Sequence, residues 1–538
     1  MHTFRPLNIS DKEVIDHHVT MLPLFKQYKS SELIFENLYA WANDECIEIM
    51  WLDDIGYIRC LKHDELWLFP PIASSHEDFV KGIMYIKDHF KHARIIGITE
   101  AMKDLIEDQD ALCLIDDKLR EYIYDTTSFI ELKGSLYHRK RNLIAQFEKK
   151  YHYDVKPYEK GDINHVNAFI DHYVKMGGAS DDLHAFYKTL HQSIHDDNYK
   201  TLLLFVDDHI EGISIGIIGK NNVGITLFEK ANSQIQGAYQ FLANMFAKTY
   251  YKDTHYISRQ EDVGIPELRK AKLSYYPIEK DMKYALYFNR DLKELYQIYL
   301  QSFPEDSKPY IDYFFLHHVS KHHVFYHKED DHIVSSFYIR KNVYHIDGTN
   351  YEIPLIVGAA THHKYQRQGH MKRLIQKYLD ECHNNDVPWV ILKTDKPNIY
   401  QSLGFKIVYE EKSLDTFNRL ENCVLEQTAN TKLLHEIYHE KFKDVPHDVR
   451  DEAYYTDYLY HLNMEGYEAY IIKHDKEMMG YIIKRDEDVI EYVLSKDVYP
   501  IIKNHDTLFH KNITYYYMIY PCVIDITHHK NVTFMNGF

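Results

Sequence analysis

A strand, a polar turn with one glycine and an amphipathic helix follow one another between residues 353 and 379. Residues 353–360 are an apolar run of strand length, and apolar residues recur at spacings of three and four in residues 374–379. The turn between them, residues 365–371, reads Tyr-Gln-Arg-Gln-Gly-His-Met. A helix N-terminus presents free N–H groups and a partial positive charge, and Gly369 allows close backbone approach. The order therefore favours phosphate binding.

This turn resembles the pyrophosphate loop of the GNAT acyltransferases, whose pattern is Gln/Arg-x-x-Gly-x-Gly/Ala. Gln366 and Gly369 match that pattern, and Met371 departs from its last position. Residues 398–405, Asn-Ile-Tyr-Gln-Ser-Leu-Gly-Phe, look like the family's closing motif, in which a tyrosine precedes Gly-Phe by one helical turn. The resemblance implies a GNAT fold over residues 288–415 with acetyl-CoA as co-substrate. The cofactor-binding residues that it implies are Val357, Ala359, Gln366, Arg367, Gln368, Gly369, His370, Met371 and Asn398.

The same resemblance implies a mechanism of acyl transfer. Residues 357–361 would pair with the pantetheine arm and offer backbone N–H groups to the thioester oxygen. Tyr400 would donate a proton to the departing sulfur, and its alternative role is packing under Phe405. The base that deprotonates the acceptor is not visible in the sequence. Its candidates are water, Glu352, Glu491 and the terminal carboxylate of Phe538.

Four ordered segments of the N-terminal half carry a second resemblance: residues 132–142, 228–231, 237–239 and 259–275. Together they look like the C-terminal domain family of phosphatidylglycerol lysyltransferases, over about residues 15–288. That family folds as two GNAT-like halves, and it contains lipid aminoacyltransferases that use aminoacyl-tRNA beside soluble members of unknown activity. Its motif positions bring together the residues that we expect to form a substrate pocket: Lys140, Arg141, Glu229, Arg259, Asp262, Arg269 and Lys272.

These charges have a physical interpretation of their own. Charged side chains are almost never buried unless they are paired, and arginine offers a planar fork of donors to a phosphate or a carboxylate. If the cations converge, they form a polar pocket. The alternative is a structural ion-pair network that joins the two halves.

Composition limits the choice of class and partner. A chain of 538 residues predicts three or four domains. The formal net charge of -18 argues against a nonspecific grip on DNA and leaves a tRNA partner unsupported. The six cysteines lie far apart, and no apolar run reaches the length of a membrane span, so we expect a cytoplasmic protein without integral membrane association. The scattered histidine pairs lack zinc-site spacing, and no metal is expected.

The segment order predicts tandem GNAT-like α/β (α+β) units with mixed central sheets flanked by helices. Three strands and a helix are expected in residues 202–251, the same order returns in residues 324–379, and a weaker trace follows in residues 467–483. Further helices are expected at residues 78–89, 100–108 and 137–150. The expected domains are residues 1–135 and 136–287, the two halves of the lysyltransferase-like part, then 288–415, the GNAT domain, and 416–538, a GNAT-like accessory domain.

Residues 450–455 and 480–483, with Glu491 beyond them, resemble the second half of the enhanced intracellular survival family of acetyltransferases. In that family the chain's own terminal carboxylate can serve as a base. We therefore expect transfer of an acetyl group to the amine of a small molecule or peptide. Two alternatives stay open at this point: an aminoacyl-tRNA-dependent transferase acting on a lipid or another acceptor, and a non-catalytic sensor or scaffold. The sequence sets neither the acceptor nor the oligomeric state.

Overall fold

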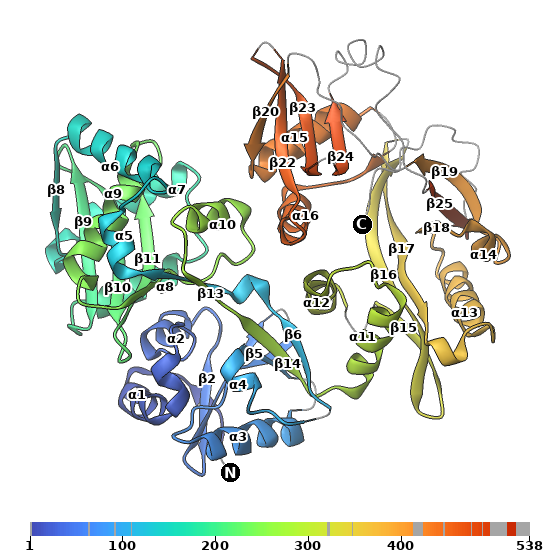
Figure 1. Cartoon of the computed structure of the whole chain (residues 1–538), viewed down its shortest axis with the longest axis horizontal. Coiled ribbons are helices and arrows are strands. Elements are labelled where there is room, and N and C mark those ends of the chain that lie inside the picture. The colour runs from blue at the N-terminus through green and yellow to red at the C-terminus, as the bar shows by residue number, and fades with distance from the viewer. Residues whose placement is uncertain are drawn as a thin grey trace. The chain divides into compact units, whose positions relative to one another are not determined.

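The computed structural model describes residues 3–62, 65–90, 93–108, 110–319, 323–346, 348–412, 423–444, 447–474, 476–486, 488–494 and 514–522. The fold is mixed α/β, with several sheets flanked by helices, as expected from the sequence. Two compact units make up the chain (Figure 1). The first contains residues 1–263 and 268–289, and the second contains residues 264–267 and 290–538. Among the described residues, no helix is both long enough and apolar enough to span a bilayer.

The first unit contains two seven-stranded sheets. One has the order β1-β2-β3-β4-β5-β14-β6, with bounds Arg5–Pro6, Glu48–Leu52, Ile55–Lys62, Glu65–Leu68, Arg94–Thr99, Lys283–Tyr287 and Leu112–Ile115. The other has the order β13-β7-β12-β11-β10-β9-β8, with bounds Glu279–Asp281, Glu121–Asp125, Tyr256–Ser258, Val223–Ala231, His209–Ile218, Tyr199–Val206 and Tyr153–Lys156. The predicted hairpin is β9 and β10, whose turn residues Asp207 and Asp208 have φ of 49° and 66°.

The helices of this unit lie between and around its sheets. Their bounds are Lys12–Met21 (α1), Phe35–Trp41 (α2), His76–His89 (α3), Glu100–Lys103 (α4), Thr126–Glu131 (α5), His138–Lys150 (α6), Ile163–Lys175 (α7), Leu183–Gln192 (α8), Ala238–Phe246 (α9) and Pro266–Leu273 (α10). Short 3-10 turns occur at Ile9–Asp11, Pro23–Gln27, Asp117–Leu119 and Lys160–Asp162, and a π-turn at Ala247–Tyr251 continues α9. The helix expected over residues 100–108 stops at Lys103, and the other expected helices of this unit are present.

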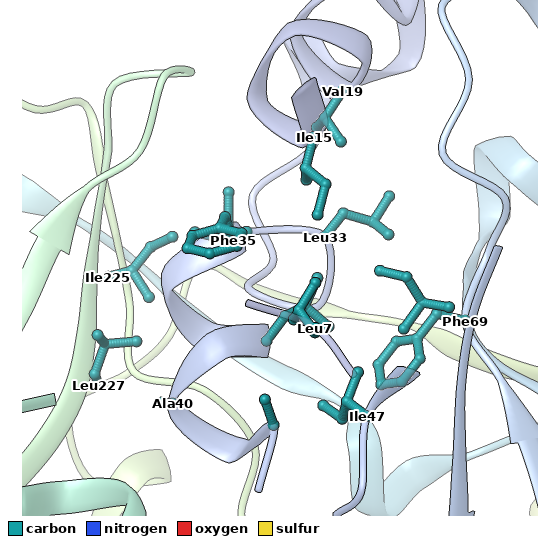
Figure 2. Close-up of a cluster of buried hydrophobic side chains, with 14 of the residues drawn as sticks. Leu7, Ile15, Val19, Leu33, Phe35, Ala40, Ile47, Phe69, Ile225 and Leu227 are labelled. Carbon is teal, nitrogen blue, oxygen red and sulfur yellow. The ribbon is translucent and has the colours of Figure 1, made fainter. Parts of the chain in front are cut away.

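The two sheets of the first unit share one hydrophobic core. Figure 2 shows Ile15, from α1, and Phe35, from α2, lying between Ile225 and Leu227 of β11 on one side and Phe69 on the other. The sheets also exchange strands across the boundary expected at residue 135. β7 precedes that boundary but pairs with β12 and β13 of the second sheet, and β14 comes from far beyond it to pair with β5 and β6. A strand joins whichever sheet offers a matching edge, whatever its place in the chain.

The second unit is built on a seven-stranded sheet and a smaller four-stranded sheet. The larger has the order β15-β16-β17-β18-β25-β19, with bounds Val324–Glu329, His332–Ile346, Thr349–Thr361, Trp389–Thr394, Thr514–Pro521 and Lys406–Lys412, and a short strand β21 (His447–Asp448) pairs with β16. The smaller has the order β20-β22-β23-β24, with bounds Cys423–Thr428, Glu468–His474, Glu477–Arg485 and Asp488–Leu494. β25 lies beyond the boundary expected at residue 415, yet it completes the larger sheet by pairing with β18 and β19.

Helices cover both faces of the larger sheet (Figure 1). The helix bounds are Arg290–Ser302 (α11), Lys308–His317 (α12), His370–Asn384 (α13), Pro397–Gln401 (α14), Thr431–Phe442 (α15) and Glu452–Met464 (α16), with a 3-10 turn at His363–Tyr365. Successive residues of β16 point to opposite faces: Phe337 packs on Tyr378 of α13, and Tyr338 packs on Tyr299 of α11. The strand–turn–helix predicted around residues 353–379 is β17, the 3-10 turn and α13.

Candidate functional sites

β17 departs from its neighbour in the larger sheet of the second unit just before the predicted loop. It pairs in parallel with β18 at Leu355 and Ile356, and no further pair between these strands is found in the described residues, although β17 continues to Thr361. Half of the backbone groups of the last five residues therefore face a side that β18 does not occupy. A gap of this kind between parallel strands can receive an extended ligand through backbone hydrogen bonds.

A bulge sits in β17 at this point. Val357 pairs with Tyr338 and Ala360 with Ser336, so Gly358 and Ala359 together stand opposite Phe337. Gly358 has φ of 59°, and a Cβ there would lie 2.8 Å from the Tyr299 ring. Only glycine fits this position without displacing that ring. The bulge re-aims the backbone of Val357 and Ala359, two of the residues expected to bind the cofactor.

The loop itself lies at the carboxyl end of β17 and leads into α13. Gly369 is the N-cap residue, with φ of 81°, and no side chain caps the helix. Within the described structure, the first N–H groups of α13 thus have no side-chain acceptor and are available to an anion. Arg367 has φ of 62°, so the turn carries two left-handed residues. All four residues from Gln366 to Gly369 are exposed.

Internal hydrogen bonds hold this loop. The Gln366 side chain donates to the Thr361 carbonyl at 3.3 Å, and the Gln368 side chain donates to the Lys364 carbonyl at 3.2 Å. Arg373, one turn into α13, donates to the Gln368 carbonyl at 3.1 Å. Among the expected cofactor residues, His370 is buried, and Met371 packs beneath the loop against the core of the larger sheet.

Tyr400 belongs to α14 and packs against the core beside the larger sheet. α14 begins shortly after β18 ends, and because β17 and β18 run parallel, their carboxyl ends lie at one edge of the sheet. The Tyr400 ring packs edge-on against the Phe405 ring, with 6.1 Å between the ring centroids. Burial raises the pKa of the Tyr400 hydroxyl. No hydrogen bond from that hydroxyl is found among the described residues. Asn398 is exposed on the same short helix.

The candidates for the general base lie in different environments. Glu491 is buried and receives a hydrogen bond from Tyr481 and an ion pair from Arg450 at 2.8 Å, so it serves a structural network and is closed to an acceptor amine. Glu352 is exposed and pairs with Lys341 across β16 and β17, beyond the bulge. Phe538 lies outside the described residues.

The expected cations of the first unit gather around an aromatic ring. The Arg259 guanidinium pairs with Glu229 at 2.6 Å and lies 5.2 Å from the centroid of the Tyr275 ring. The ammonium of Lys140 lies 4.0 Å from the centroid of the same ring. Burial, followed by the nearby charge of Arg259, lowers the pKa of Lys140 to about 8. Two cations thus share the Tyr275 ring, and Glu229 balances the charge of one of them, Arg259.

The other three expected cations are bound elsewhere in the first unit. The Lys272 ammonium donates to the carbonyl oxygens of Arg259 at 2.7 Å and Gln260 at 3.2 Å, so it fixes the loop that carries Arg259. Arg269 pairs with Asp262 at 2.8 Å and with Asp117 at 2.5 Å.

Arg141 donates to the carbonyl oxygens of Leu132 and Gly134 and so clamps the turn before α6. The contacts support both interpretations of these charges. Arg269, Lys272 and Arg141 make structural ion pairs and hydrogen bonds. Lys140 and Arg259 face a common ring, as a pocket would require. Tyr275 was part of the sequence motifs. Its position next to both cations depends on how α10 packs relative to α6, and no local sequence pattern predicts that packing.

Two family models match this chain, and together they cover residues 25–408. Residues 25–287 match the family model described as phosphatidylglycerol lysyltransferase, C-terminal, and residues 284–408 match the model of the acetyltransferase (GNAT) domain. The chain therefore carries a lysyltransferase-like domain followed by a GNAT-type acyltransferase domain, as both resemblances indicated. These acyltransferase-family matches support a transferase.

Individual relatives are distant. An uncharacterized protein of Mycoplasmoides gallisepticum is 23% identical over 223 residues, which cover 39% of this chain and 71% of that protein. A conserved protein of unknown function from Bacteroides thetaiotaomicron superposes with a TM-score of 0.48 at 23% identity and covers 53% of this chain and 99% of its own. L-PGS from Bacillus licheniformis superposes with a TM-score of 0.37 at 14% identity and covers 48% of this chain and 88% of its own.

Proposed function

We propose that the GNAT domain transfers an acetyl group from acetyl-CoA to the amine of a small molecule or peptide. The observation that carries this proposal is the single edge of the larger sheet where β17 and β18 separate. That edge holds the bulged backbone of β17 and the uncapped start of α13, and α14, which carries Tyr400, follows the end of β18. An acyl-CoA offers three matching parts: an extended amide arm, a pyrophosphate and a sulfur leaving group.

The residues of this edge have separate tasks in that reaction. The N–H groups at the start of α13, with Gln366 and Arg367, bind the pyrophosphate. The free side of residues 357–361 pairs with the pantetheine arm and donates to the carbonyl oxygen as the amine nitrogen attacks the thioester carbon. The carbon–sulfur bond then breaks, and Tyr400 supplies the proton that the leaving sulfur takes. Because burial raises its pKa, Tyr400 holds that proton at neutral pH.

The acceptor must lose a proton, and we assign that proton to water. Glu491 is closed off by Arg450 and Tyr481, and Glu352 is already paired with Lys341. A water-mediated route favours acceptors whose amines are partly neutral near pH 7 to 8.

The Tyr400→Phe variant tests this assignment. It keeps the ring and its contact with Phe405 and removes only the hydroxyl, so stability should change by about 1 kcal/mol or less. Turnover should fall by roughly 10²-fold, the low end for a lost general acid, with acetyl-CoA affinity unchanged. The assay follows free thiol while polyamines, aminoglycosides and amino acids are offered as acceptors. Undiminished turnover in the variant would leave Tyr400 as a packing residue.

A second candidate activity belongs to the first unit: aminoacyl transfer from aminoacyl-tRNA. It is favoured by the Lys140–Tyr275–Arg259 arrangement, in which a lysine of lowered pKa lies beside an arginine–carboxylate pair. Thermal shift separates the candidates. Acetyl-CoA should raise the melting temperature through the GNAT domain, and aminoacyl-tRNA should bind only if the first unit is active. A sensor or scaffold without catalysis would give no product with either donor.

A further inference from the structure

We propose that His327, Glu329 and His370 bind a divalent transition-metal ion, with Zn²⁺ as the expected member of that class. The three residues belong to the second unit, and none has a part in the acyl transfer described above beyond the place of His370 next to the loop. This inference replaces the expectation, drawn from histidine spacing, that the chain holds no metal.

The strand β15 places two of the ligands. Residues at alternate positions of a strand point to one face, so Phe325, His327 and Glu329 share a face. That face looks onto α13, because the Phe325 ring packs on Tyr378 of that helix with 4.6 Å between centroids. His370, the first residue of α13, meets the other end of the same face, where its ring lies 5.3 Å from the ring of His327.

The distances between ligand atoms suit a common ion. His327 Nε2 lies 2.8 Å from Glu329 Oε1, and His370 Nδ1 lies 3.6 Å from the same oxygen. One ligand atom from each of the three residues lies within 4.8 Å of the others. Tetrahedral zinc with bonds of about 2.0–2.1 Å separates its ligand atoms by about 3.3 Å, so small rotations of the exposed carboxylate and of His327 would complete the set.

The three side chains differ in how far they are buried. The His370 side chain is 5% exposed, whereas those of His327 and Glu329 are 40% and 44% exposed. A buried imidazole fixed in place at the base, with two mobile ligands at the rim, leaves room for water or another ligand on the solvent side. Two histidines and one carboxylate with open positions are a donor set that zinc and its neighbours in the first transition row accept, and Mg²⁺ or Ca²⁺ prefer all-oxygen sets.

Two other groups face His370. Gln368 Oε1 lies 3.4 Å from His370 Nε2 and can orient the ring, as partners of metal-bound histidines commonly do. Arg373 Nη2 lies 3.1 Å from His370 Nδ1, the atom that would bind the ion. Because the Arg373 side chain is exposed, it can move away on metal binding, but its charge opposes the ion. Removing that charge should therefore strengthen binding.

The test is titration of the purified full chain, stripped with chelator, with Zn²⁺ and separately with Mg²⁺. With its 36 histidines the chain will also bind zinc weakly at its surface, so the measured quantity is the tightest class of site. We expect one tight site for Zn²⁺ and none for Mg²⁺. His327→Ala and Glu329→Gln should each weaken that site by at least tenfold, and the matched control His332→Ala, an exposed histidine on the neighbouring β16, should leave it unchanged.

Two further measurements keep the proposal open to refutation. Arg373→Gln should tighten zinc binding by about two- to fivefold, the scale of a surface charge interaction. Zn²⁺ should raise the melting temperature of the wild-type chain more than that of Glu329→Gln, a variant that keeps the carboxylate's shape and should fold even if His370→Ala does not. If Glu329→Gln and His327→Ala bind zinc as tightly as the wild type, or if the wild type has no tight site, the three residues form a hydrogen-bonded cluster and no metal site.

Discussion

Substitution of Gly369 is the sharpest test of the phosphate loop, because the backbone conformation disfavours a side chain there while the surrounding space nearly allows one. Its φ of 81° lies in the left-handed region, where a side chain is strained. A Cβ added there would lie 3.1 Å from Arg373 Nη1, the end of a flexible and exposed side chain that can shift. Space is thus nearly sufficient, and the cost of a substitution comes from backbone strain and from any charge introduced.

Asparagine and aspartate separate these two costs. Both tolerate the left-handed region better than other residues, so Gly369→Asn should weaken acetyl-CoA binding by about 1 kcal/mol, roughly fivefold. Gly369→Asp has the same shape and adds an anion next to the expected pyrophosphate, for which we take a charge separation of about 5 Å. At an effective dielectric constant of about 20, one such charge pair costs about 3 kcal/mol, which adds a factor of roughly 10².

Calorimetry of acetyl-CoA binding at two salt concentrations measures both variants. The gap between aspartate and asparagine should narrow as salt rises, because screening acts on the charge and not on the strain. Melting temperatures of the two variants should agree closely, since the loop is exposed in the free protein. Equal affinities for Gly369→Asp and Gly369→Asn at low salt would show that no phosphate lies at this turn.

Three further predictions concern ionisable groups. Lys140 should react with an amine-specific reagent with an apparent midpoint near pH 8, well below an ordinary lysine, as followed by peptide mass spectrometry over pH 6 to 11; a midpoint above 10 would contradict its burial. Arg450→Met should lower the free energy of unfolding of the second unit, measured in urea, by about 3–5 kcal/mol, because the buried carboxylates of Asp448 and Glu491 lose the cation that pairs with them; a loss below 1 kcal/mol would refute this. Burial lowers the pKa of His461 to about 3, so its contribution to stability is complete above pH 6.5 and is lost as pH falls toward 3. Between pH 6.5 and 5 that loss should be about 1–2 kcal/mol, and His461→Gln should remove this part of the pH dependence.

Local pattern was sufficient for the elements around the GNAT loop. The apolar run at residues 353–360 and the helical spacing after Met371 fall within β17 and α13. The hairpin at Asp207 and Asp208 was equally predictable, because two short polar residues between apolar runs are typical of a tight turn. In each case neighbours in sequence are also neighbours in space, so periodicity alone carries the prediction.

Pairing between distant segments could not be predicted in this way. β14 completes the first sheet, and β25 enters the larger sheet of the second unit between β18 and β19, each from far along the chain. Both are short apolar strands that would suit several sheet edges, and their choice depends on which edges the rest of the fold leaves open. The boundaries expected at residues 135 and 415 follow the order of segments along the chain, so they separate β14 and β25 from the strands with which these two pair.

The same distinction separates the site residues that were expected from those that were not. Gln366 and Gly369 were visible because a phosphate loop is continuous in sequence, whereas a site assembled from a strand and the start of a helix has no local spacing to reveal it. His327 and Glu329 look like an ordinary exposed pair on a strand until α13 brings His370 beside them. Both arrangements depend on the first turn of α13: its N–H groups face the loop, and its first side chain faces β15. A ligand that orders this turn at one site should therefore change the affinity of the other site for its ligand. We expect zinc binding and acetyl-CoA binding to be energetically coupled.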